Sequence, residues 1–168
     1  MDCVATLHPP CSTLRSLVFA AYGRRCPIRG SAILRGAMSR ENLEIVRRTM
    51  EATNRRDLEA MDDLISENFE FHSTFAASEG RMFRGHRGIR EYFETLEEAF
   101  DDLHLEAEDI VDAGDDRVVL LVWVSGRGKG SEIPVRHLYG QIWTLSDGRV
   151  EKIESYLDPA EALRGAGL

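Results

Sequence analysis

The sequence predicts an α+β fold in which helices cover one face of a curved antiparallel sheet. From residue 39 to about residue 100, apolar residues recur mostly at the spacing of an amphipathic helix. After Asp101 and Asp102 the pattern changes to alternation, which is typical of strands, and it continues to residue 157. No helical segment separates these later strands, so short turns must join them, and we expect neighbouring strands to run antiparallel.

Three helices are expected in the N-terminal half. The first starts at Ser39, which suits an N-cap, and ends near Asn54. Asp57 caps a short second helix, and a third helix follows Gly85. The predicted buried stripes are Leu43, Val46, Met50 and Thr53 in the first helix, Leu58, Met61, Leu64 and Ile65 in the second, and Ile89, Phe93, Leu96 and Phe100 in the third.

One short strand is expected at residues 68–73, followed by an exposed loop over residues 75–85. Glycine and aspartate clusters predict turns between the later strands, and Asp147-Gly148 is typical of a tight hairpin because both residues tolerate a positive φ. Asp158 and Pro159 then suit the N-cap and first position of a short C-terminal helix. The four later strands are predicted at about 103–112, 117–127, 133–145 and 149–157.

The 168 residues, of which 43% are hydrophobic, suit one domain over residues 38–168, preceded by a disordered basic leader over residues 1–37. Three interpretations of the leader stay open: an organellar transit peptide, a secretory signal, or upstream sequence with Met38 as the biological start. We favour the third. The leader carries five arginines against Asp2, a net charge of +4, and subtracting this from −8 leaves −12 for the domain. That charge argues against nucleic acid and acidic membrane surfaces as partners.

All three cysteines, Cys3, Cys11 and Cys26, lie in the leader, so the domain has no thiol for a disulfide, a metal or catalysis. Their odd number fits a reducing compartment, and a cytoplasmic location is expected. The longest apolar run of the leader, residues 17–22, is too short to span a bilayer. Neither metal-ligand spacing nor a phosphate-binding loop is found, so no cofactor and no metal are expected.

Four segments of the chain carry a resemblance to a known family. They are residues 54–59 (NRRDLE), 83–90 (FRGHRGIR), 142–150 (IWTLSDGRV), and the tail with residues 156–158 and 161–163. Over about residues 40–168 the chain resembles the SnoaL-like branch of the nuclear transport factor 2-like superfamily. The resemblance implies a cone-shaped, curved antiparallel sheet packed against three N-terminal helices, with a short C-terminal helix and a pocket for a small hydrophobic molecule.

Ketosteroid isomerases share this fold, and the resemblance allows a comparison by position. Their base aspartate falls on His72, their oxyanion-binding tyrosine on about Thr49, and their protonated aspartic acid on about Gly140. Both oxyanion donors are therefore replaced, and steroid isomerisation is not expected.

Two residues are candidates for catalysis. A histidine can act as a general acid or base, and the resemblance places His72 inward, although Phe69 and Phe71 are the natural inward residues of the same strand. Asp109 shares strand parity with Leu105 and Val111 and would then enter the cavity, but a slipped register or bulge would expose it instead, which is the interpretation we favour.

Five residues are candidates for ligand binding: Thr49, Tyr92, Trp123, His137 and Tyr139. His137 and Tyr139 share a strand face with Gln141 and Trp143, opposite Leu138 and Ile142. If Leu138 and Ile142 face the helices, Trp143 and Trp123 lie on the outer face of the sheet. There they would bury against a second copy, which predicts a homodimer through the sheet face.

Two hypotheses about function follow. The first is a pocket for a small hydrophobic metabolite, with cofactor-free acid-base chemistry at His72 of the kind used for isomerisation or ring closure of a polyketide-like compound. The second is a ligand-binding or dimerisation module without turnover. They differ in whether a second titratable group stands near His72 inside a water-poor cavity.

Overall fold

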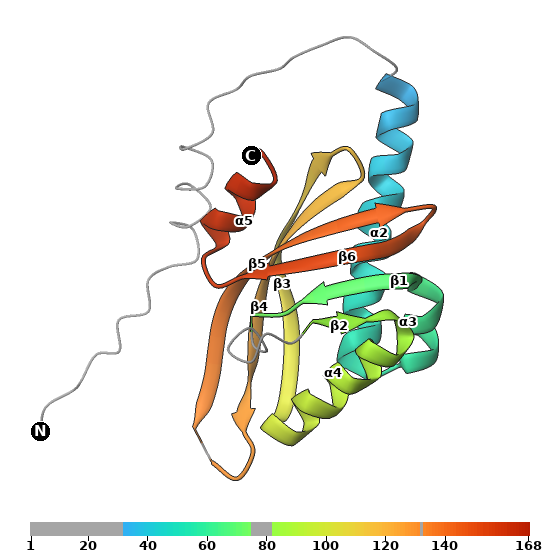
Figure 1. Cartoon of the computed structure of the whole chain (residues 1–168). Helices are drawn as coiled ribbons and strands as arrows, with labels where there is room; N and C mark the ends of the chain where they lie inside the picture. The colour runs from blue at the N-terminus through green and yellow to red at the C-terminus, as the bar shows by residue number, and fades with distance from the viewer. Residues whose placement is uncertain (1–31, 75–81, 132) are drawn as a thin grey trace, which may run out of the picture. The chain divides into compact units, whose positions relative to one another are not determined.

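The computed structural model describes residues 32–74, 82–131 and 133–168, with side chains from Arg40 onward (Figure 1). Within these residues, three helices precede most of the sheet and another short helix follows it, as the sequence predicts. The elements are α2 (Ala32–Arg55), α3 (Leu58–Leu64), β1 (Ile65–His72), β2 (Phe83–Arg84), α4 (Gly85–Ala99), β3 (Phe100–Gly114), β4 (Arg117–Gly128), β5 (Pro134–Ser146), β6 (Arg149–Tyr156) and α5 (Pro159–Gly165).

The six strands form one open sheet in the order β2-β1-β6-β5-β4-β3. Strands β3 to β6 form the predicted antiparallel meander. β1, however, pairs with β6 in parallel, so the sheet is mixed and the prediction of a purely antiparallel sheet needs this correction. β1 is far from β6 in the sequence, and residue patterns do not show which strands become neighbours or in which direction they run.

The sheet is covered by helices on both faces. Along β4, Val118, Leu120 and Val122 pack in the cluster formed with α2, α3 and α4, whereas Val119 and Leu121 pack in the cluster formed with α5. Alternate side chains of a strand point to opposite faces, so the apolar run from residue 118 to 122 is buried from both sides. Helices therefore cover both faces of this part of β4.

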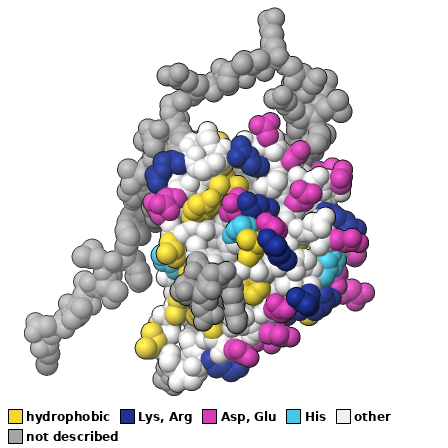
Figure 2. Space-filling view, viewed as in Figure 1, with side chains coloured by type: hydrophobic (Ala, Val, Ile, Leu, Met, Phe, Trp, Pro, Cys, Tyr) yellow, Lys and Arg dark blue, Asp and Glu magenta, His cyan; other side chains and the backbone are white. Residues whose placement is uncertain are grey.

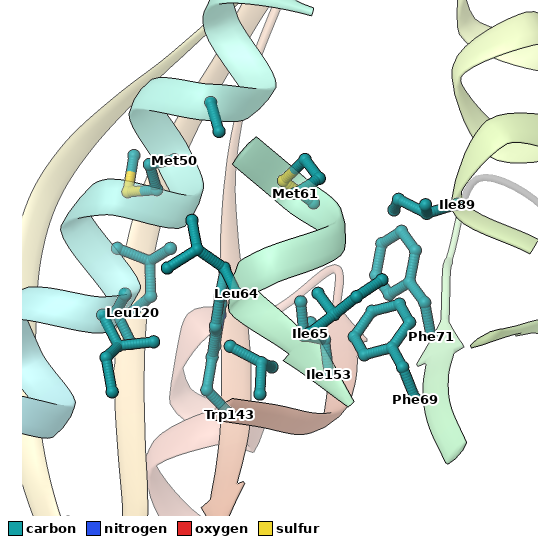
Figure 3. Close-up of a cluster of buried hydrophobic side chains, with 14 of the residues drawn as sticks. Met50, Met61, Leu64, Ile65, Phe69, Phe71, Ile89, Leu120, Trp143 and Ile153 are labelled. Atoms are coloured by element: carbon teal, nitrogen blue, oxygen red, sulfur yellow. The ribbon is translucent and has the colours of Figure 1, made fainter. Parts of the chain in front are cut away.

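The larger cluster joins α2, α3 and α4 to β1, β5 and β6 (Figure 3). Phe69 and Ile65 of β1 are completely buried, and Met61 of α3 is 2% exposed. The side chains drawn in Figure 3 meet from the helices and from the sheet, which makes one continuous apolar core. Burial of this apolar surface is the main force that holds the helices on the sheet.

The first helix begins earlier than predicted. α2 starts at Ala32 rather than at Ser39. Residues 32–38 include two alanines, one leucine, one arginine and one methionine, which favour helices, and Ser39 lies inside the helix rather than at its cap. The predicted disorder of the leader falls mostly on residues 1–31, which lie outside the described residues.

The turn between α2 and α3 explains one of the family-like segments. The Asn54 side chain donates from Nδ2 to the Leu105 carbonyl at 2.8 Å and accepts from the Leu105 N–H at Oδ1, also at 2.8 Å. Arg56 has a φ of +56°, and the Asp57 carboxylate then caps α3 by accepting from the Ala60 N–H at 3.0 Å. Since β3 is an edge strand, Asn54 satisfies two main-chain groups of Leu105 that no neighbouring strand reaches.

Two glycines shape the junction between β2 and α4. Gly85 has a φ of +59°, which favours glycine, and a Cβ there would lie 2.9 Å from the Glu67 carbonyl oxygen. A Cβ at Gly88 would lie 2.7 Å from the Phe83 carbonyl carbon. The FRGHRG segment is therefore a close crossing of backbone, and it brings α4 onto the sheet.

The C-terminal elements match the prediction closely. Asp147 and Gly148 have φ values of +49° and +73°, as the predicted hairpin turn requires. The Asp158 carboxylate accepts from the Ala160 N–H at 2.9 Å and caps α5. α5 packs on the face of the sheet opposite α2, α3 and α4.

Candidate functional site

A pocket of about 100 Å³ lies between the helices and the face of the sheet that α2, α3 and α4 cover, which is its inner face. Its wall is mostly aliphatic and aromatic, and its residues come from α2, α3, α4 and all of the longer strands. The apolar wall includes Met50, Met61, Phe71, Ile89, Leu96, Phe100, Leu103, Leu105, Leu120, Val124, Val135, Trp143 and Ile153.

The polar groups of the wall are all uncharged. They are hydroxyls and one amide, and among the residues that the structure describes no aspartate, glutamate, histidine, lysine or arginine lines the pocket. A charged ligand would lose its hydration without gaining a partner of opposite charge from these residues. The polar lining consists of Thr49, Thr53, Ser73, Thr74, Tyr92, Ser125, Tyr139, Gln141 and Ser155.

Tyr92 of α4 lies among aromatic rings. Its ring packs edge-on against Phe71, with centroids 4.7 Å apart, and against Phe83 at 5.2 Å. Burial raises the pKa of Tyr92 far above its usual value, and a hydrogen bond with the Ser73 side chain opposes that shift only in part. At neutral pH Tyr92 is therefore an uncharged phenol.

Tyr139 of β5 is the second titratable group of the described wall. Burial raises the pKa of Tyr139 as well, and the two phenols are close enough that charge on Tyr139 raises the pKa of Tyr92. His137 packs edge-on against the Tyr139 ring, with centroids 4.6 Å apart. Thr49, whose hydroxyl donates to the Ile45 carbonyl at 2.8 Å, completes the set of predicted ligand-binding residues that the structure places in the pocket.

Gln141 is a polar residue of the wall that the sequence analysis did not predict as a site residue. The Trp143 indole N–H donates to the Gln141 amide oxygen at 3.0 Å, and the Gln141 amide nitrogen donates to the Ser155 hydroxyl at 3.2 Å. Gln141 and Ser155 are direct partners across β5 and β6. The alternation of Tyr139, Gln141 and Trp143 along one strand face could have revealed Gln141, had that face been assigned to the pocket.

His72 lies on the other face of β1. Phe71 and Ser73 line the pocket, whereas His72 points away from it and is 36% exposed. The His72 Nε2 atom lies 3.2 Å from the Glu70 carboxylate, which also pairs with Arg84 at 3.2 Å. The expected inward placement of His72 is therefore wrong, because the alternation of β1 places the aromatic residues inside and the polar residues outside.

Asp109 is exposed on β3. The pairing with β4 shifts register between Ala107 and Asp109, and the Asp109 carboxylate accepts from the N–H of Ile110 at 2.9 Å. This β-bulge reverses the strand parity, so that Ile110 packs in the inner cluster and Val111 in the outer cluster. The suggestion that Asp109 enters the cavity is overturned, and the bulge that the sequence analysis favoured is present.

The two remaining ligand-binding candidates lie outside the pocket. His137 is exposed, and its Nε2 atom lies 3.1 Å from the Leu157 carbonyl oxygen. Trp123 lies on the outer face, where its indole donates to Glu108 at 3.0 Å and the Arg136 guanidinium lies 4.5 Å from the ring centroid. Leu138, on that same outer face, packs in the cluster with α5.

The face assignment on which the dimer prediction depended is reversed. Trp143 is 4% exposed and belongs to the inner core, whereas Ile142 packs beneath α5. Gly140 also faces α5, where a Cβ would lie 2.6 Å from the Cβ of Ala162. The glycine that takes the position of the isomerase's acid is thus a contact between sheet and helix, and it does not face the pocket.

Charged groups gather elsewhere on the domain. Asp62 of α3 pairs with Arg90 and with His86, whose Nδ1 atom lies 2.8 Å from the Asp62 carboxylate, and this cluster ties α3 to α4. Acidic and basic side chains are interspersed over the face shown in Figure 2. Within the described ranges no group of three or more His, Cys, Asp or Glu side chains is arranged to hold a metal ion. Nor does any described helix have the length and apolarity needed to cross a membrane.

A curved sheet with three helices over one face and an apolar pocket between them defines a class of α+β domains. The SnoaL-like domain family matches residues 46–153, and the chain belongs to this family. No curated protein matches the chain.

Solved structures agree on the fold. An NTF2-like protein of unknown function from Burkholderia pseudomallei K96243 superposes with a TM-score of 0.62 at 20% identity, over 74% of this chain and 95% of its own. A protein named as a SnoaL-like polyketide cyclase from Jannaschia sp. CCS1 gives 0.60 at 21% identity, over 86% and 96%. An LEH-like epoxide hydrolase of M. tuberculosis gives 0.58 at 14% identity, over 76% and 85%. At these identities the likeness shows the fold alone.

Proposed function

We propose that the protein binds a small, neutral and largely apolar molecule in the pocket between its helices and its sheet. The observation that carries the proposal is the wall itself, which is mostly apolar and whose described polar groups are all uncharged. Such a wall favours apolar ligands through the hydrophobic effect and disfavours ions, which would be desolvated without compensation.

The phenols of Tyr92 and Tyr139 give this pocket a polar end. Both have a raised pKa and therefore keep their protons at neutral pH. A neutral phenol is a good donor to an oxygen acceptor such as a carbonyl or an ether. The bound molecule is thus expected to carry at least one such oxygen on an apolar frame.

The names of the structural neighbours are compatible with this proposal. One is named as a polyketide cyclase and another as an epoxide hydrolase, and both names refer to reactions of small organic molecules. The acid-base form of the hypothesis has less support, because His72 lies outside the pocket and no described carboxylate or imidazole lines it. We therefore propose ligand binding as the main function and acid-base turnover as the alternative.

One titration tests both hypotheses, ligand binding and acid-base turnover. The probe is 1-tetralone, a neutral bicyclic ketone whose protons next to the carbonyl exchange with solvent when a general base removes them. The full chain is titrated with the ketone in deuterated buffer, and methyl NMR signals are followed for Ile89 and Leu120 in the pocket and for Val119 and Leu121 on the outer face. Binding is expected to shift the pocket methyls alone, without faster deuterium uptake by the ketone.

Leu120→Trp is the matched variant, because it fills the pocket from the centre of β4. It should abolish the shifts, whereas Leu121→Met on the outer face should retain them. Shifts that persist in Leu120→Trp, or none in the native protein, would reject the pocket as the binding site. Deuterium uptake that depends on the pocket would restore the acid-base hypothesis.

We further propose a homodimer through the sheet face that carries Trp123, in place of the face that carries Trp143. Trp123 is only partly buried, with Arg136 stacked over its ring, and aromatic and arginine side chains are enriched in protein interfaces. Analytical ultracentrifugation should give a dimer that Trp123→Glu dissociates. A native monomer at micromolar concentration would contradict this proposal. The cytoplasmic location predicted from the cysteines remains part of the proposed function.

A further inference from the structure

Three side chains form a directed chain of hydrogen bonds in the pocket wall. Trp143 donates to Gln141 at 3.0 Å, and Gln141 donates to Ser155 at 3.2 Å. All three residues line the pocket. The backbones of Gln141 and Ser155 are already paired in the ladder of β5 and β6, so the strands do not need this side-chain bond in order to associate.

The indole determines the direction of the chain. An indole N–H can only donate, so the Gln141 oxygen must point to Trp143 and the amide NH₂ must point to Ser155. The Ser155 oxygen accepts one of the two amide protons. The second N–H of Gln141 and the hydroxyl proton of Ser155 remain available to the pocket, since neither donates to another of the described residues.

We propose that Gln141 and Ser155 form a donor site for a carbonyl-type oxygen of the ligand, and that Trp143 positions the amide so that the site donates rather than accepts. This inference rests on the proposed function, since it assumes that the pocket is occupied. In addition to the phenols of Tyr92 and Tyr139, it gives the pocket a second position that can hydrogen-bond the ligand. It also identifies the ligand class as neutral ketones or quinones.

The donor site and the phenol of Tyr139 would contact the ligand from one strand face. Tyr139 and Gln141 are two residues apart on β5, so their Cα atoms lie roughly 6.5–7 Å apart at the usual rise of a strand. A ligand with two oxygen acceptors at about that separation would engage both. A ligand hydroxyl could still accept from Gln141 through its oxygen, but its own proton would then need an acceptor, so it should bind less tightly than a carbonyl.

The test compares three probes that share one bicyclic frame: 1-tetralone, which accepts, 1-tetralol, which also donates, and tetralin, which does neither. Affinities for the full chain are measured by NMR titration, and the side-chain amide of Gln141 is followed in the same spectra. One good hydrogen bond is expected to favour the ketone over tetralin by about 3- to 10-fold. The ketone alone should shift the Gln141 amide strongly.

Variants separate the donor site from the phenols. Gln141→Met and Ser155→Ala should bring the ratio of ketone to tetralin affinity near one, and Ser155→Thr should restore the ratio by returning the hydroxyl. Trp143→Phe frees the amide to rotate and should also lower the ratio. Thr144→Val, on the opposite face of β5, is the matched control and should not change it.

The outcomes are distinct. If no probe binds, the proposed function fails, and the donor site fails with it. If the ketone and tetralin bind equally, or if the ketone preference survives in both Gln141→Met and Ser155→Ala, the pocket function stands and the donor site is rejected. Loss of the preference in Tyr139→Phe alone would assign it to the phenols and would also overturn this inference.

Discussion

Replacing Asn54 with alanine is expected to destabilise the domain by about 1–3 kcal/mol. The Asn54 amide makes two hydrogen bonds of 2.8 Å to the main chain of Leu105, and both are partly buried. A hydrogen bond of this kind contributes about 0.5–1.5 kcal/mol to stability, and two of them account for the range. They also join the end of α2 to the free edge of β3, two segments that lie far apart in the sequence.

Asn54→Asp refines the test because it changes one atom. At neutral pH the carboxylate still accepts from the Leu105 N–H, but its second oxygen then faces the Leu105 carbonyl oxygen. A protonated carboxyl would instead donate to that carbonyl, so the folded state raises the pKa of the new aspartate above its unfolded value of about 3.9. The stabilising contribution is therefore present at pH below ~3.9 and lost as pH rises through the folded pKa.

The assay is urea denaturation of the full chain, followed by circular dichroism and tryptophan fluorescence. Asn42→Ala is the control, since Asn42 lies on the same helix and its 3.4 Å contact with Asp116 is exposed. That control should change stability by less than about 0.5 kcal/mol. If Asn54→Ala is no more harmful than Asn42→Ala, the role assigned to the bridge between α2 and β3 is refuted.

Three further predictions concern single side chains. Burial raises the pKa of Tyr92, so this phenol should resist ionisation in an absorbance titration. The stability of the wild-type protein should therefore fall more steeply above pH ~10 than the stability of Tyr92→Phe. Equal slopes of stability against pH would argue against a buried phenol. Gly140→Ala should cost about 1–3 kcal/mol through its contact with α5, and added Ala162→Gly should recover part of the loss in urea melts; a neutral Gly140→Ala would show that α5 moves freely. The pKa of Glu70 is lowered chiefly by its hydrogen bond with His72, so His72→Ala should raise it toward its ordinary value in carboxyl NMR, with 1-tetralone binding unchanged; loss of binding would return His72 to the site.

Local patterns sufficed for most elements. The helical stripes at Ile89, Phe93 and Leu96, the caps at Asp57 and Asp158, and the hairpin turn at Asp147 appear where the sequence predicts them. Each of these depends on residues within one or two turns of the chain. The start of α2 and the length of β3 were less well predicted, because good helix formers and edge strands can extend without a clear signal.

The candidate site was predicted only in part. Thr49, Tyr92 and Tyr139 line the pocket, as expected for ligand-binding residues, whereas His72, Asp109, His137 and Trp123 do not. The misplacements have one common cause, which is the choice of strand face. A strand with apolar residues on both faces, such as β5, does not reveal which face meets the larger core.

The sequence by itself determined the α+β class, the order of the longer helices and strands, the caps at Asp57 and Asp158, and the hairpin turn at Asp147, because these depend on contacts between residues close in the chain. Tertiary structure alone decided that β1 joins β6 in parallel, that a bulge turns Asp109 outward, and that Tyr139, Gln141 and Trp143 face the pocket. The physical reason is that alternation along a strand defines two faces but does not show which of them is turned to the pocket. Which face lines the pocket depends on where α2, α4 and α5 bury their own apolar side chains against the sheet.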